Sequence, residues 1–221
     1  RSLAVVRTGE EVIRETSLHG AVLTRVALSH IRVGTFQYIA ARQKRDELEM
    51  LFNYVIERHY PNIKNSKKKP IDLLEIVLDN QIDLIVNWMR VGFIHGVMNT
   101  DNMSISGETI DYGPCAFMDV YDPKTVFSSI DQMGRYAYCN QPVIGKWNLT
   151  RFAECLIPLI DHDQKKAIEQ ATEIIDTFEK KYEEKWLNMM RDKLGLFGVD
   201  DKDKSLILDL LTWMHQKKMD Y

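Results

Sequence analysis

The sequence predicts an α+β fold that is predominantly α-helical. Two β-branched runs near the N-terminus are typical of a β-hairpin. Apolar residues recur at helical spacing over residues 71–91, and a helical pattern continues from Trp147 to the end of the chain. The 221 residues are 45% hydrophobic and 28% charged, which suits a single domain with one large core.

The first third of the chain predicts a hairpin followed by two helices. Residues 3–15 form the expected hairpin, with its turn at Thr8-Gly9-Glu10 between the two β-branched runs. Residues 20–43 are expected to be mostly helical, with Gly34 as a candidate break. Residues 45–59 place their apolar side chains on one face, which predicts an amphipathic helix.

The clearest predicted helix covers residues 71–91, and Gly92 provides a stop signal after it. Its apolar residues at helical spacing are Leu74, Val77, Leu78, Ile82, Ile85, Trp88 and Met89. A loop from His95 to Asn102 is expected next, followed by two short strands at residues 103–105 and 109–110. Prolines and glycines then predict irregular structure until the C-terminal helices.

Composition excludes some classes of partner. The formal net charge of -3 gives no overall attraction to nucleic acid or to an anionic membrane. No apolar run approaches the roughly 20 residues that a membrane-spanning helix needs. The three cysteines, Cys115, Cys139 and Cys155, have no metal-ligand spacing and are interpreted as reduced thiols.

Residues 95–113 carry the most informative motif. Asp101, Asn102 and Asp111 lie within eleven positions of one another, around a tight turn, and Asp111 opens an Asp-Tyr-Gly triplet. Hard divalent cations prefer such oxygen ligands, and phosphoryl chemistry uses those cations to neutralise phosphate charge. The motif therefore predicts the metal-binding part of a protein-kinase-like lobe.

One position departs from the usual kinase pattern. A kinase catalytic loop reads His-x-Asp-x-x-x-x-Asn, in which the Asp accepts the proton of the substrate hydroxyl. Counted from His95, Asn102 falls at the expected position, but the position of the base is Val97, which cannot accept a proton. This pattern leaves two interpretations. The nucleotide reacts in a pose that differs from that in a kinase, with Asp101 beside the metal-binding Asn102, or the protein is a catalytically dead kinase.

Two arginines are candidate phosphate ligands. Arg25 and Arg32 are seven residues apart, so on a helix they would share one face with a rise of about 10 Å between them. That separation suits a triphosphate. The alternative from spacing alone is two surface arginines, or one arginine buried in a salt bridge.

Four separated motifs resemble the selenoprotein O (SelO) family, in that family's order. They are Thr8-Gly9-Glu10, the stretch from Ser29 to Gln37, the block from Asp101-Asn102 to Asp111-Tyr112-Gly113-Pro114, and Cys139-Asn140-Gln141-Pro142. The resemblance covers essentially the whole chain. Members of this family are kinase-fold proteins that transfer AMP, rather than phosphate, from ATP to protein hydroxyls.

The resemblance implies a role for each candidate residue. Asp101 would accept the proton of a Ser, Thr or Tyr hydroxyl on a protein substrate. Asn102 and Asp111 would hold Mg²⁺ or Mn²⁺, and Arg25 and Arg32 would contact the phosphates of ATP. ATP is expected to lie flipped relative to ordinary kinases, which would explain Val97. The bacterial cytoplasm is the default location, or the mitochondrion in a eukaryote.

The kinase-like parts that normally precede the catalytic loop are mostly missing from the sequence. It has no Gly-rich phosphate loop, so the chain is expected to be an internal fragment, one C-terminal lobe, that is nearly inactive alone. Residues 1–16 would be a hairpin near the hinge, residues 17–146 the catalytic core, and residues 147–221 a helical part. The alternative function is a pseudokinase that binds nucleotide or acts as a scaffold.

Overall fold

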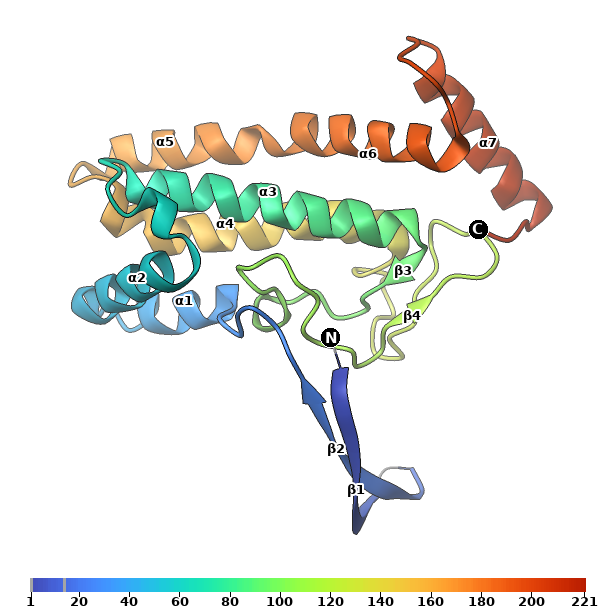
Figure 1. Ribbon diagram of the computed structural model, residues 1–221, viewed down its shortest axis with the longest axis horizontal. Helices are drawn as coiled ribbons and strands as arrows, with labels where there is room; N and C mark the ends of the chain where they lie inside the picture. The colour runs from blue at the N-terminus through green and yellow to red at the C-terminus, as the bar shows by residue number, and fades with distance from the viewer. Residues whose placement is uncertain (1, 14) are drawn as a thin grey trace.

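The computed structural model describes residues 2–13 and 15–221, and it has the predicted α+β, mainly helical character (Figure 1). In chain order the elements are β1 (Ser2–Ile13), β2 (Ser17–Arg25), α1 (Val33–Ala40), α2 (Arg45–His59), the 3₁₀ helix η1 (Pro61–Ile63), α3 (Lys69–Arg90), β3 (Phe93–Ile94), η2 (Thr100–Asn102), β4 (Ala116–Phe117), η3 (Tyr138–Asn140), α4 (Gln141–Ile160), α5 (Gln164–Asp176), α6 (Phe178–Leu194) and α7 (Asp203–Lys217).

The core lies around α3, which packs against both α4 and α6. Figure 1 shows α3 and α4 side by side, with α5 and α6 running in succession along them. Leu74, Ile82 and Ile85 of α3 are fully buried. The helix ends as predicted, because Gly92 takes a left-handed conformation with φ of 67°.

The N-terminal hairpin is longer than expected, and the predicted turn is wrong. Strands β1 and β2 pair antiparallel, and the chain reverses between Ile13 and Ser17. Residue 14 of the predicted hairpin lies outside the described residues. Thr8-Gly9-Glu10 lies inside β1, where the register shifts between Arg7 and Glu11 and Gly9 has φ of 81°. A glycine with positive φ serves a β-bulge as well as a turn, so the motif alone does not separate the two.

The helix expected over residues 20–43 is also wrong. Its first part is β2, and only Val33–Ala40 is helical. Val22 and Thr24 are β-branched residues that pair with β1, so cross-strand pairing determines the conformation of this segment. Gly34 does not break α1 but lies in its first turn.

The remaining helices agree with the sequence pattern, but the two short strands after Asn102 do not form. Residues 103–105 and 109–110 share one antiparallel bridge, between Met103 and Thr109. The next helix begins at Gln141, six residues before Trp147, and α7 covers the last predicted helix. None of the helices in the described part of the chain has the length and apolar character to cross a membrane.

Candidate functional site

The five residues singled out from the sequence lie around one cavity of about 190 Å³. Arg25, Arg32, Asp101, Asn102 and Asp111 line it, and the wall is completed by His30 and Ile110. They come from the end of β2, the start of α1, η2 and the loop that precedes β4. Polar residues up to 86 positions apart in the sequence therefore line the same cavity.

A short hydrogen-bond network orients Asp101 and Asn102. The side chain of Asn99 accepts a hydrogen bond from the backbone N–H of Asp101 at 3.0 Å. The amide of Asn102 donates through Nδ2 to the carbonyl of Val97 at 2.9 Å. Because the nitrogen of that amide points at the backbone, its oxygen remains available as a ligand.

The loop around Asp111 is fixed by its own side chains. Asp111 accepts a hydrogen bond through Oδ1 from the backbone N–H of Gly113 at 2.8 Å, which forms an Asx turn. The hydroxyl of Tyr112 donates to the carbonyl of Thr109 at 2.9 Å. One carboxylate oxygen of Asp111 thus holds the turn, and the second makes no hydrogen bond that restricts it among the described residues.

The two arginines reach the cavity by a route that the sequence spacing did not predict. They share no helix face: Arg25 is the last residue of β2, and Arg32 is the residue that precedes α1. Arg25 donates to the carbonyl of Ile110, directly before Asp111. Nε of Arg32 is buried and has no hydrogen-bond partner among the described residues. A buried charged donor of this kind favours an anionic partner.

His95 contacts the loop that carries Asp101 and Asn102. It is fully buried, and its ring lies 5.2 Å from that of Trp88. Its Nδ1 accepts a hydrogen bond from the backbone N–H of Val97 at 3.3 Å. Burial lowers the pKa of His95 from 6.5 to about 4, against a smaller opposing effect of Asp111. The neutral ring therefore braces the loop.

The donor set of the cavity fits a hard divalent cation that is only partly held by protein. Asp111 and Asn102 offer a carboxylate and an amide oxygen, which are ligands that Mg²⁺ and Mn²⁺ prefer. Mg²⁺ is commonly bound by one or two carboxylates together with substrate phosphates and water. Over the described residues, no group of three or more His, Cys, Asp or Glu side chains is placed to hold a metal.

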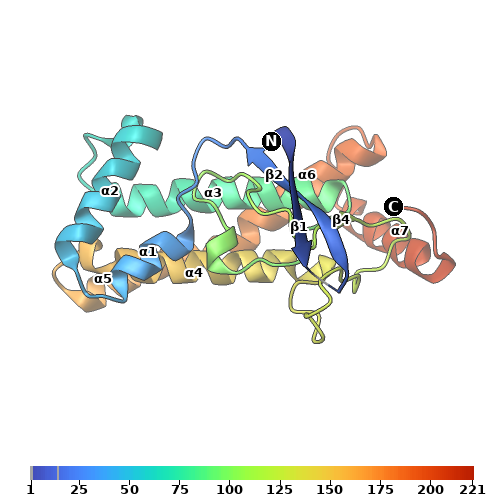
Figure 2. The same cartoon turned by 90° about the horizontal axis from the view of Figure 1, so that it is seen from below.

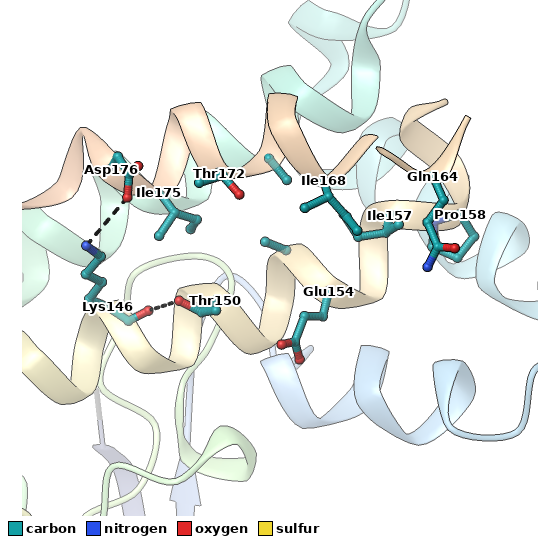
Figure 3. Close-up of a pocket in the computed structure, with 12 residues that line it drawn as sticks. Lys146, Thr150, Glu154, Ile157, Pro158, Gln164, Ile168, Thr172, Ile175 and Asp176 are labelled. Carbon is teal, nitrogen blue, oxygen red and sulfur yellow. Dashed lines mark hydrogen bonds and ion pairs between the residues drawn. The ribbon is translucent and has the colours of Figure 1, made fainter. Parts of the chain in front are cut away.

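His30 is also a wall residue of the cavity, although it was not among the candidate site residues taken from the sequence. It lies two residues before Arg32, in the same Ser-His-Ile-Arg stretch, and that proximity was the signal that could have identified it. A larger groove of about 710 Å³ lies between α4 and α5 (Figure 3). Its floor is apolar, with Ile157, Ile168 and Ile175, and none of the predicted site residues lines it.

Comparison with known proteins defines the family. The family model described as "Protein adenylyltransferase SelO" matches residues 1–221. The chain belongs to the SelO family.

Curated relatives with the name protein nucleotidyltransferase YdiU match the whole chain. The protein from Pelagibacter ubique is 71% identical over 221 residues, which is 100% of this chain and 46% of the relative. The protein from Alcanivorax borkumensis is 61% identical and that from Nitrosococcus oceani 58%, each over the whole of this chain and 46% and 45% of the relative. The chain thus spans about half the length of the relatives it matches.

Proposed function

We propose that this chain carries the catalytic part of a protein adenylyltransferase, which transfers AMP from ATP to Ser, Thr or Tyr hydroxyls of protein substrates. The observation that carries the proposal is the meeting of two arginines, two aspartates and one asparagine around a single cavity. Membership of the SelO family and the names of the relatives support the same reaction class.

The reaction assigns a separate task to Asp101. The oxygen of the acceptor hydroxyl attacks the α-phosphorus of ATP, and the bond from that phosphorus to the oxygen bridging to the β-phosphate breaks. Pyrophosphate leaves with the bonding electrons, and the hydroxyl proton passes to the carboxylate of Asp101. Asp101 is the exposed carboxylate of the cavity, so an incoming protein side chain can reach it.

Cationic groups balance the charge of the triphosphate in this proposal. Asn102 and Asp111 would hold Mg²⁺ or Mn²⁺, which supplies positive charge beside the phosphates when it is bound. Arg25 and Arg32 would bind phosphate oxygens, a task that suits the fixed fork of donors on a guanidinium. Arg32 is the stronger candidate of the two because its Nε is buried without a partner in the described chain.

A pseudokinase is the second candidate, and Val97 is the observation that favours it. The usual position of the base carries no titratable group, and Val97 holds the loop through hydrogen bonds of its backbone. A pseudokinase would use the same cavity to bind nucleotide without transferring any part of it.

Intact-protein mass spectrometry of the full-length polypeptide, incubated with ATP and Mg²⁺ or Mn²⁺, tests the proposal. Self-modification or modification of an added protein should appear as a gain of about 329 Da per AMP. A gain of about 80 Da would show phosphate transfer instead. Nucleotide binding with no mass gain on any protein of a cell extract would favour the pseudokinase.

A further inference from the structure

Gly34 touches the residue that the proposed reaction uses as its base. It is a buried residue in the first turn of α1. A Cβ atom built on Gly34 would overlap Oδ1 of Asp101 and would lie 3.0 Å from Cγ and 3.3 Å from Cα of the same residue. The three nearest atoms to that added carbon thus all belong to Asp101.

The backbone conformation does not require glycine at this position. Gly34 is helical, and unlike seven other glycines of the described residues it does not have a positive φ. In a helix, glycine is less favourable than alanine by about 1 kcal/mol. Space for the carboxylate of Asp101, rather than backbone freedom, is therefore the reason that a glycine suits this position.

The backbones of α1 and of the η2 segment are joined by a hydrogen bond where Gly34 meets Asp101. A new methyl group on residue 34 therefore has to be accommodated by the side chain of Asp101. The N–H of Val33, directly before Gly34, donates to the carbonyl of Met103 at 3.0 Å. On the other side Asn99 holds the backbone of Asp101. The first bond ties α1 to the residue after η2 and the second fixes η2 itself, whereas the carboxylate is the free end of a side chain.

We infer that Gly34 is a positioning residue, which keeps open the space in which the carboxylate of Asp101 is held toward the cavity. This inference rests on the proposed function, because it gives Gly34 an effect on AMP transfer through Asp101. An added methyl group would turn the carboxylate away while leaving the arginines and Asp111 in place. Turnover should then fall without a matching loss of nucleotide binding.

Gly34→Ala in the full-length polypeptide tests this inference. The expected result is a kcat at least 10-fold lower, with the Kd for ATP and the KM changed less than 2-fold, because small displacements of a reacting group cost about 10²-fold in rate. The melting temperature should stay the same or rise, since alanine favours the helix. An unchanged kcat would overturn the inference.

Gly145→Ala is the matched control. Gly145 is also a buried helical glycine, and a Cβ there would overlap the end of a flexible side chain, Cδ1 of Ile85. That contact lies between α4 and α3, away from the cavity. Because Ile85 is fully buried and Asp101 is exposed, only the overlap at Gly145 should lower stability. This variant should leave kcat unchanged, which is the reverse of the pattern expected for Gly34→Ala.

A double-mutant cycle with Asp101→Ala separates the inference from the proposed function. If Gly34 acts through Asp101, the alanine at position 34 should lower kcat in the wild-type background and have no further effect in the Asp101→Ala background. Additive effects would overturn the inference alone. Full activity of Asp101→Ala would overturn the proposed role of Asp101.

The cycle also covers the case in which Gly34→Ala fails to fold. Removing the Asp101 side chain beyond Cβ removes the overlapping oxygen, so the double variant should then recover the fold. Failure of both variants to fold would show that the space beside Gly34 serves a purpose other than Asp101, and would overturn the inference.

Discussion

At the scale of single residues, Asp111 has two tasks. One carboxylate oxygen accepts the hydrogen bond that holds its own turn, and the carboxylate also lines the cavity. Asp111→Asn keeps an acceptor for Gly113 but removes a negative charge beside the expected cation. Metal-dependent ATP binding, measured by calorimetry with Mg²⁺ and with EDTA, should weaken at least 10-fold. Asp209→Asn, on the exposed surface of α7, is the control and should bind ATP as the wild type does.

Asp101→Asn should show the opposite pattern. The amide can keep the shape of the side chain but cannot accept the hydroxyl proton, and a general base contributes roughly 10²- to 10⁴-fold to rate. Radiolabelled AMP transfer should fall by that order while the Kd for ATP stays within a few-fold. A large loss of ATP binding would instead place Asp101 among the metal or phosphate ligands.

The burial of His95 should make the free energy of unfolding depend on pH. Burial lowers its pKa from 6.5 to about 4, so the unfolded chain binds a proton at this residue more readily than the folded chain does. The stabilisation is fully present above pH 6.5 and is lost as the pH falls from 6.5 toward 4. At about 1.4 kcal/mol per pH unit, the loss at this one group is roughly 3 kcal/mol.

Urea unfolding between pH 7.5 and 4.5 checks this dependence. The free energy of unfolding of His95→Gln should fall less steeply below pH 6.5 than that of the wild type. His162→Gln changes an exposed histidine in the loop after α4 and should keep the wild-type slope. Equal slopes for all three proteins would contradict the role assigned to the burial of His95.

The sequence predicted five residues that the structure brings around one cavity, but it did not predict all of their geometry. Asp101, Asn102 and Asp111 are close in sequence, so a motif with fixed spacing could predict that they act together. Arg25 was predicted on a helix and lies on a strand, because its neighbours pair with β1, which no local pattern shows. The contact between Gly34 and Asp101 depends on the approach of α1 and η2, which spacing cannot reveal.

At the scale of elements, α3 determines the stability of the helical part, because it packs against α4, α5 and α6. Ile82→Ala removes a fully buried side chain from this helix, and such truncations cost about 2–5 kcal/mol. Met50→Ala on α2, where the side chain is 72% exposed, should cost less than about 0.5 kcal/mol. Chemical denaturation of the two variants checks the difference, and similar losses would contradict the central position of α3.

Elements that depend on local signals were predicted from the sequence, and features that depend on a partner strand were not. The period of 3.6 residues in α3 and the glycine after it are local signals, so the helix was predicted within two residues at each end. The bulge at Gly9 depends on the register of a partner strand. The bridge between Met103 and Thr109 is too short to carry the alternating pattern that identifies a strand.

At the scale of the whole molecule, the chain spans 46% of the length of its Pelagibacter ubique relative and contains no Gly-rich phosphate loop. We therefore expect the 221 residues alone to bind ATP more weakly than the full-length polypeptide and to transfer AMP at least 10-fold more slowly, because fewer groups position the triphosphate. Side-by-side transfer assays with labelled ATP check this. Equal rates would show that these residues suffice for catalysis.

The hairpin of β1 and β2 has a practical consequence for work on this chain. It extends away from the helices in Figure 1 and is therefore drawn in front of them in the view from below in Figure 2. Val5, Ile13 and Val22 are more than half exposed on it. A two-stranded ribbon with open edges and apolar faces is a template on which other copies can add strands. Preparations of the 221 residues should therefore become turbid as their concentration rises, and a polar residue at Ile13 should delay that onset.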